Sequence, residues 1–99
     1  MIQEHAVLII KAGSETEFEA AFSRAVAYLA ASKGYISHTL QRSIESPNRY
    51  GLFVQWRTLE DHTQGFRGSP AFGEWRALIG PFFDSPPVVE HYRLVARSG

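Results

Sequence analysis

The stretch YISHTLQRSIESPNRYGLFVQW, residues 35–56, predicts a β-hairpin. Residues 35–43 alternate as a strand, and residues 50–56 form a second, aromatic-rich strand. Between them, residues 45–48 (Glu-Ser-Pro-Asn) are typical of a turn. Alternation places four side chains of the first strand on one side, namely Ile36, His38, Leu40 and Arg42.

The residues before the hairpin predict a strand and a helix. Residues 4–10 are apolar and β-rich, and residues 12–13 (Ala-Gly) end that strand with a turn. Ser14 stands three residues before Glu17, which is the spacing of a capping box, and Gly34 is a good helix stop. Between them the apolar residues recur at helical spacing: Phe18, Phe22, Ala25, Val26 and Leu29.

The residues after the hairpin predict two short helices and a last strand. Thr58 with Asp61 indicates one helix start, with Leu59, His62 and Phe66 on one face, and Ser69-Pro70 indicates another. The second helix carries Phe72, Trp75 and Ile79 on its apolar side, residues 81–87 form a loop, and residues 88–95 form the last strand.

The predicted order is βαββαβ, which is an α+β, ferredoxin-like fold with an antiparallel sheet. Right-handed crossovers place both helical segments on one face of that sheet. The strands nevertheless read as apolar on both faces, because Leu52, Val54 and Trp56 point one way and Phe53 points the other. We expect a homodimer packed sheet to sheet; the alternative is a single chain with a partly exposed apolar face.

Composition narrows the possible functions. A chain of 99 residues fits one domain, residues 1–99, and its ten basic residues balance its ten acidic ones. Because no basic patch stands out, we expect neither nucleic acid nor membrane as a partner. The chain has no cysteine, no apolar run long enough to span a bilayer and no signal-peptide pattern, so we expect a cytoplasmic protein without disulfides.

Residues 56–76 gather the groups that a small organic ligand needs. This segment carries aromatic rings, one imidazole and one guanidinium that the predicted fold returns to one neighbourhood: Trp56, His62, Phe66, Phe72, Trp75 and Arg76. Rings can hold a flat molecule, and the two polar groups can move a proton and hold an anion.

Several motifs in order resemble the antibiotic biosynthesis monooxygenase (ABM) superfamily over nearly the whole chain. They are Gly34-Tyr35, residues 40–43 (LQRS), residues 50–56, residues 69–72 (SPAF) and residues 89–92 (VEHY). The resemblance implies a dimeric α+β barrel with a pocket between helices and sheet in each chain. It also implies oxidation of phenolic substrates with O2 and with no cofactor.

The same resemblance implies a set of site residues. Trp56 and Arg76 match a Trp and an Arg of the superfamily's active site, whereas His62 stands where that site has a Tyr and Leu52 where it has an Asn. Haem-degrading relatives use an Asn, a Trp and an axial His, where this chain has His5, Phe66 and Arg76. Since Arg cannot ligate ferric iron as imidazole does, haem degradation is not expected.

The chemistry favours specific roles for these residues. A phenolic substrate must lose a proton before it can reduce O2, and His62 is the side chain suited to take it near neutral pH. Arg76 then holds the resulting anion. We expect Trp56 beside them as a third catalytic residue, and a substrate-binding lining formed by Leu52, Phe66, Phe72, Trp75, His38 and His5.

Each residue also has a purely structural interpretation. His62 could simply bond to Asp61 or to backbone, and Arg76 could pair with Glu74 or Asp84 on the surface. His5 and His38 could be hydrogen-bonded interior or interface histidines, Trp56, Phe72 and Trp75 could be core, and His91 is expected to be structural. The histidine spacing predicts no metal site.

The sequence leaves the type of function open. We expect a cofactor-independent monooxygenase acting on a small aromatic, phenolic or quinol-like molecule. The alternatives are a ligand-binding module without turnover and an isomerase or lyase built on the same barrel.

Overall fold

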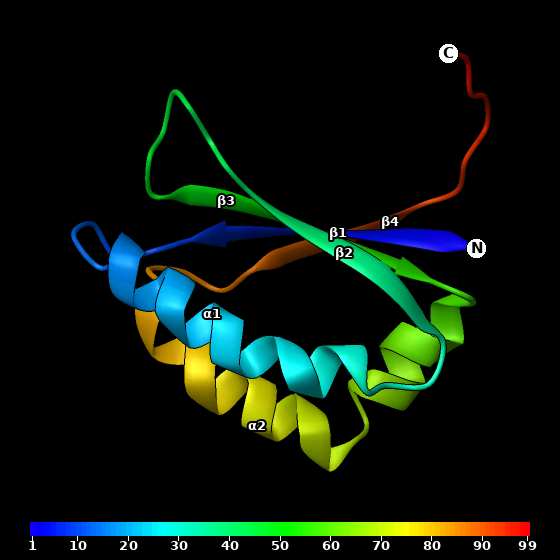
Figure 1. Cartoon of the computed structure of the whole chain (residues 1–99), viewed down its shortest axis with the longest axis horizontal. Coiled ribbons are helices and arrows are strands. Elements are labelled where there is room, and N and C mark those ends of the chain that lie inside the picture. The colour runs from blue at the N-terminus through cyan, green and yellow to red at the C-terminus, as the bar shows by residue number, and fades with distance from the viewer.

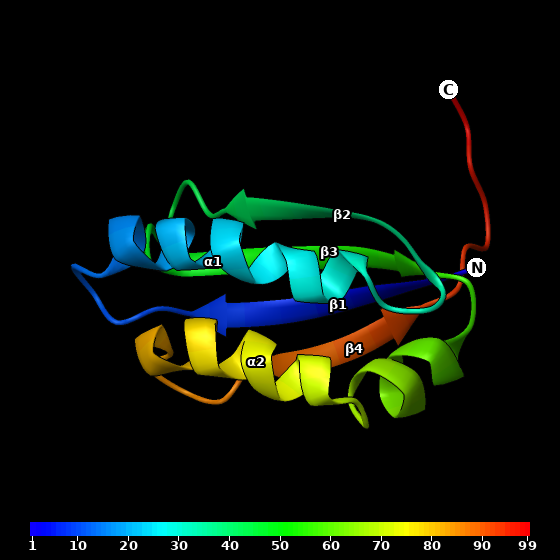
Figure 2. The ribbon, with the colours of Figure 1, turned by 60° about the horizontal axis from the view of Figure 1, so that its bottom comes forward.

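The computed structural model describes residues 1–99 as one antiparallel sheet covered by helices (Figure 1). The strands lie in the order β2-β3-β1-β4, with β1 at Ile2–Ile9, β2 at Tyr35–Arg42, β3 at Arg49–Trp56 and β4 at Val88–Tyr92. Helices α1 (Glu15–Ala30) and α2 (Pro70–Ile79) lie side by side on one face of the sheet (Figure 2). A π-helical segment η1 (Asp61–Phe66) precedes α2, and a 3-10 turn η2 (Gly80–Phe82) follows it. The predicted ferredoxin-like fold is confirmed.

The core lies between the helices and the inner face of the sheet. Alternation along β1 turns Glu4, Ala6 and Leu8 inward, while the residues between them stay partly exposed. In β3 the inward residues are Tyr50, Leu52, Val54 and Trp56, as predicted for the last three. From the helices, α1 contributes Phe18, Phe22, Ala25 and Leu29, and α2 contributes Trp75 and Ile79.

No helix of this chain covers the outer face of the sheet (Figure 1), although residues 93–97 border it at one end. His5 stacks on Phe53 there, with ring centroids 4.5 Å apart, and Val88 and Tyr92 of β4 are 60% and 47% exposed. Polar residues such as Gln55 share this face, since they alternate with the buried row of β3. The outer face is therefore less apolar than the sequence suggested.

A β-bulge in β2 corrects the predicted alternation. Tyr35 pairs with Trp56, but the next pair joins Ser37 to Gln55, so one extra residue lies in β2. Ile36 is consequently 44% exposed and does not share a face with His38, as alternation had predicted. Tyr35 takes that place instead, because its hydroxyl lies 2.6 Å from His38 Nδ1.

Three details at the ends of helices and strands differ from the predicted ones: the cap of α1, the end of α1 and the end of β4. Helix α1 begins after Ser14 as expected, but the capping box is not formed, because the Ser14 side chain makes no cap bond and Glu15 accepts from Gly13 N–H instead. This helix ends at Ala30 and not near Gly34, which lies in the following turn with φ +83°. Strand β4 ends at Tyr92.

The start of η1 follows the sequence, since Asp61 N–H donates to Thr58 Oγ1 at 3.1 Å. His62 and Phe66 share its buried face, whereas Leu59, which was expected beside them, is 38% exposed. None of the helices has the length and the apolar surface needed to cross a bilayer.

Candidate active site

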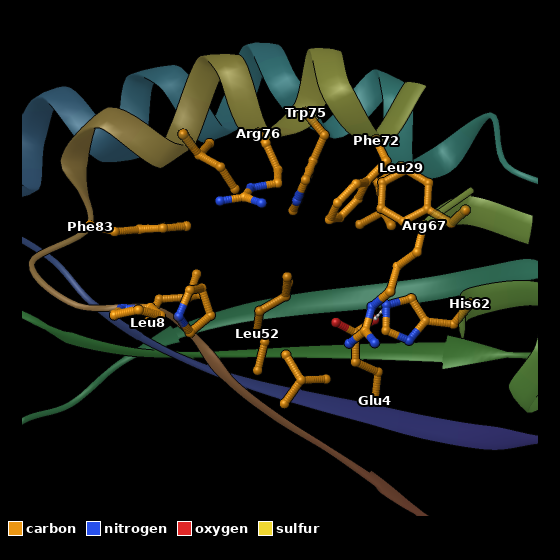
Figure 3. A pocket seen from close by; sticks show the side chains of 16 residues that line it. Glu4, Leu8, Leu29, Leu52, His62, Arg67, Phe72, Trp75, Arg76 and Phe83 are labelled. Carbon is orange, nitrogen blue, oxygen red and sulfur yellow. Dashed lines mark ion pairs between the residues drawn. The ribbon is translucent and has the colours of Figure 1, made fainter. Parts of the chain in front are cut away.

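A cavity of about 270 Å³ lies between the sheet and α2 (Figure 3). Ten of its 16 lining residues are hydrophobic, and four are charged or titratable: Glu4, His62, Arg67 and Arg76. Such a mostly apolar hollow with a few polar groups is typical of a small-molecule site.

Separate parts of the chain build the floor, the roof and one end of this cavity. Strands β1, β3 and β4 supply Ala6, Leu52 and Val89 as the floor. Helix α2 supplies Phe72, Trp75 and Arg76 as the roof, as Figure 3 shows. The η1 segment and the residue after it place His62, Phe66 and Arg67 at one end.

Glu4 and His62 form a buried pair at that end. Glu4 is 6% exposed and His62 is 3% exposed, and Glu4 Oε1 lies 3.3 Å from His62 Nε2. Trp56 Nε1–H donates to the same oxygen at 3.0 Å, and the Trp56 ring stacks on His62 with centroids 5.2 Å apart. The indole and the imidazole therefore hold one carboxylate oxygen from two directions.

His62 continues this chain of contacts to β4. His62 Nδ1 lies 2.8 Å from His91 Nε2, and His91 is only partly buried. The contact follows from the sheet, because Glu4 and His91 are paired residues of β1 and β4. Three titratable side chains are thus linked from the cavity toward solvent.

Burial and nearby charges shift the pKa values of all three groups. Burial lowers the pKa of His62 to about 3, and the positive charge of Arg67 and the neighbouring His91 act in the same direction. Burial raises the pKa of Glu4, although the Trp56 hydrogen bond and Arg67 partly oppose this shift. Burial and Arg67 also lower the pKa of His91. Both imidazoles are therefore neutral at pH 7.

The two arginines are cations at the edges of the cavity. Arg67 reaches down to the Glu4–His62 pair, while Arg76 lies farther along α2 (Figure 3). Arg76 makes no ion pair with Glu74, Asp84 or any other carboxylate within 4.0 Å, and its guanidinium carbon lies 5.9 Å from the centre of the Phe72 ring. The surface pairing considered from the sequence is therefore not formed, and Arg76 is free to meet a ligand.

The structure brings six of the nine predicted site residues to the cavity wall: His62, Arg76, Leu52, Phe66, Phe72 and Trp75. Trp56 is fully buried and lies behind Glu4 and His62, not in the wall. His38 is bonded to Tyr35 and packs edge-on against Phe22, and burial lowers its pKa. His5 lies on the outer face of the sheet, because it is one residue out of phase with Glu4.

Sequence reasoning missed Glu4, Arg67 and His91. Glu4 could have been found, because it is in phase with Ala6 and Leu8 on a strand, and a carboxylate in a buried row is unusual. The sequence carries no comparable signal for Arg67. The role of His91 depends on its pairing with Glu4, and strand register is not visible in the sequence.

Comparisons with known proteins agree with this fold. The sequence profile described as antibiotic biosynthesis monooxygenase matches residues 1–78. The uncharacterised protein YczJ of Bacillus subtilis (strain 168) is 48% identical over 93 residues, which cover 94% of this chain and 98% of YczJ.

Solved structures show the same relationship. A protein of Bordetella bronchiseptica named as an antibiotic biosynthesis monooxygenase has a TM-score of 0.93 and 41% identity, covering 96% of this chain and 97% of its own. SnoaB of Streptomyces nogalater, a cofactor-independent oxygenase, shares the fold at a TM-score of 0.75 and 22% identity, covering 99% and 94% of the two chains. By its sequence profile and its relatives, the chain belongs to the antibiotic biosynthesis monooxygenase family.

Proposed function

We propose that the protein is a cofactor-independent monooxygenase that oxidises a small phenolic or quinol-like aromatic molecule with O2. The observation that carries the proposal is the arrangement of polar groups in the apolar cavity. The buried Glu4–His62 pair lies at one end, and the unpaired guanidinium of Arg76 lies away from that end. The fold shared with SnoaB, a cofactor-independent oxygenase, supports the same class of reaction.

The cavity suits a flat molecule of one or two rings. Its volume of about 270 Å³ lies just below the range of roughly 300–1,000 Å³ that is usual for small-molecule sites. The rings of Phe66, Phe72 and Trp75 can pack against both the faces and the edges of such a molecule. A phenolic hydroxyl at the Glu4–His62 end leaves the opposite side of the ring system toward Arg76.

The proposed reaction needs no reductant other than the substrate. A phenol with hydrogen at the para carbon loses its hydroxyl proton and that carbon-bound hydrogen, and gains one oxygen atom from O2. The products are a quinone and one water, so a phenol plus O2 equals a quinone plus H2O. O2 adds to the para carbon on the side of the ring that faces Arg76, and Arg76 would stabilise the peroxide anion that forms there before water leaves. The apolar walls would keep solvent water from this anion.

The experiment is O2 uptake by purified, chelator-treated protein with one- and two-ring phenols and hydroquinones, such as 1-naphthol, measured against the rate without protein. We expect Arg76→Ala to lower kcat/KM roughly 10- to 100-fold, a moderate loss because the guanidinium is partly open to solvent. Arg24→Ala on the exposed side of α1 is the matched control and should keep the full rate.

Three results would contradict the proposal. Equal rates for wild type and Arg76→Ala would remove Arg76 from the site. Tight binding of phenols without O2 uptake would favour a ligand-binding module. Turnover that persists without O2 would favour an isomerase or lyase, in which the same Glu4–His62 pair moves a proton.

We further propose that two copies pack through the outer faces of their sheets. The exposed Val88 and Tyr92 and the half-buried Phe53 lie on this face, where no helix of the chain covers them. A second copy of the same face would remove this apolar surface from water and complete a barrel of two sheets.

A further inference from the structure

The two oxygens of the Glu4 carboxylate have different surroundings. Oε1 accepts from Trp56 Nε1–H at 3.0 Å and lies 3.3 Å from His62 Nε2. Oε2 has no hydrogen-bond partner in the protein. Every fully buried side-chain oxygen or nitrogen in the structure has such a partner, so Oε2 is not fully buried. Glu4 lines the cavity (Figure 3), and because Oε1 is engaged, Oε2 is the oxygen that a ligand in the cavity can reach.

His62 has no nitrogen left for a ligand. Its Nε2 faces Glu4 and its Nδ1 faces His91, at 3.3 Å and 2.8 Å. A neutral imidazole has one N–H and one lone pair. With the His62 proton on Nε2, Nδ1 accepts from His91 Nε2–H, and the Nε2 proton faces the Glu4 carboxylate. His62 would have to break one of these contacts to accept a proton from a substrate.

We propose that Glu4, and not His62, takes the proton from the phenolic substrate, with Oε2 as the accepting atom. The inference rests on the proposed function and deepens it. Trp56 and His62 are then positioning residues, because they fix Oε1 and so turn Oε2 toward the cavity.

The step conserves atoms and charge within the cavity. The substrate O–H bond breaks, its electron pair stays on the substrate oxygen, and the proton forms a new O–H bond on Oε2. Glu4 becomes a neutral acid while the substrate becomes a phenolate, so one negative charge moves a short distance beside Arg67. Such a transfer avoids creating a new net charge in an apolar site.

The surroundings of Glu4 make it a stronger base than an exposed glutamate. Burial raises its pKa, and the charged or titratable groups that face it are His62 of η1, Arg67 after η1, His91 of β4 and, across the cavity, Arg76 of α2. A pKa closer to the working pH improves general base catalysis.

The kinetic test compares Glu4→Gln with His62→Gln, using 1-naphthol and O2 uptake from pH 6 to pH 10. Glutamine keeps an oxygen for Trp56 N–H but cannot accept the proton. We expect Glu4→Gln to lower kcat at least 100-fold at pH 7, with the deficit narrowing toward pH 10, where a phenol of pKa near 10 ionises in water. His62→Gln should lower the rate less and keep the pH profile of the wild type.

A second measurement separates this inference from the oxygenase proposal. Infrared difference spectra of 1-naphthol binding without O2 should show the carbonyl stretch of a protonated carboxylic acid in wild type and not in Glu4→Gln. If that band appears but no phenol drives O2 uptake, Glu4 is the proton acceptor and the oxygenase proposal fails.

Other outcomes would overturn the inference. A rate for Glu4→Gln within threefold of the wild-type rate at pH 7 would overturn it. A rate loss that narrows toward pH 10 in His62→Gln, and not in Glu4→Gln, would also overturn it, because His62 would then be the base. Absence of the infrared band in wild type would also overturn it. If Glu4→Gln does not fold by circular dichroism, Glu4→Asp, which keeps a carboxylate but withdraws it from the cavity, should lower kcat with the wild-type pH profile.

Discussion

His62 is buried without a positive charge, and this burial makes stability depend on pH. Its pKa is about 3 in the folded protein and about 6.5 when unfolded, because burial, Arg67 and His91 all oppose protonation. Below pH 6.5 the unfolded chain therefore binds a proton that the folded chain does not, and stability falls until pH reaches about 3. Glu4 has the opposite effect on the pH dependence of stability. Because burial raises its pKa, the folded chain binds this proton more tightly than the unfolded chain, and the resulting stabilisation is lost as pH rises.

Urea unfolding at pH 7 and pH 4 measures the contribution of His62. The wild type should lose roughly 2–3 kcal/mol of unfolding free energy relative to His62→Gln between these two values. His5→Gln is the control, because it removes a histidine from the other face of the sheet and leaves the Glu4, His62 and His91 contacts intact. An equal pH dependence in wild type and His62→Gln would contradict this account.

For individual residues, the sequence predicted which side chains line the cavity better than which side chains bond to one another. The aromatic rings of residues 66–75 and the cation of Arg76 could be predicted, because short-range spacing places them around one cavity. The contacts of Glu4 could not, since Trp56 lies 52 positions away in sequence and meets it only through the pairing of β1 with β3. His5 was misplaced for the same reason, as one step along β1 changes the face.

Among the elements, the turn between α1 and β2 depends on one glycine. Gly34 has φ +83°, and a Cβ atom there would lie 2.1 Å from Asp61 Oδ2 and 2.6 Å from Asp61 Cβ. We expect Gly34→Ala to destabilise the protein by about 2–4 kcal/mol, from backbone strain and this clash together. Displacement of Asp61 would also disturb η1, which carries His62.

Gly73→Ala is the matched control for that substitution. Gly73 lies within α2, and a Cβ atom there would meet nothing within 4 Å. Alanine should therefore stabilise the helix by about 0.5–1 kcal/mol. The thermal unfolding midpoint should fall in Gly34→Ala and rise in Gly73→Ala. If both midpoints moved in the same direction, the close approach of Asp61 to Gly34 would not explain the effect of Gly34→Ala.

Element types were predictable from periodicity, whereas local irregularities were not. The spacing of Phe18, Phe22, Ala25 and Leu29 identifies α1 because one helical face must be apolar. The bulge that moves Ile36 to the outer face leaves no mark in a strand that otherwise alternates. The unformed capping box at Ser14 shows likewise that a suitable residue pair need not make the bond.

At the scale of the whole molecule, the uncovered face of the sheet is the feature that a second copy would bury. The proposed dimer predicts a sedimentation mass twice the chain mass of 11.1 kDa. Phe53→Glu puts a charge on the outer face and should give a monomer, whereas Tyr28→Glu on exposed α1 should leave the dimer intact. A wild type that sediments as a monomer would refute the dimer, provided circular dichroism shows that it is folded.

The division of the cavity into floor and roof has a consequence for how such proteins diversify. Glu4, Trp56 and His91 belong to the sheet, whereas Phe72, Trp75 and Arg76 belong to α2. Changes in the helix can therefore remodel the shape of the accepted molecule while the proton-handling groups are inherited unchanged. A library confined to α2 positions other than Arg76 is the direct route to new substrate preferences, because its members would vary in fit and share one chemistry.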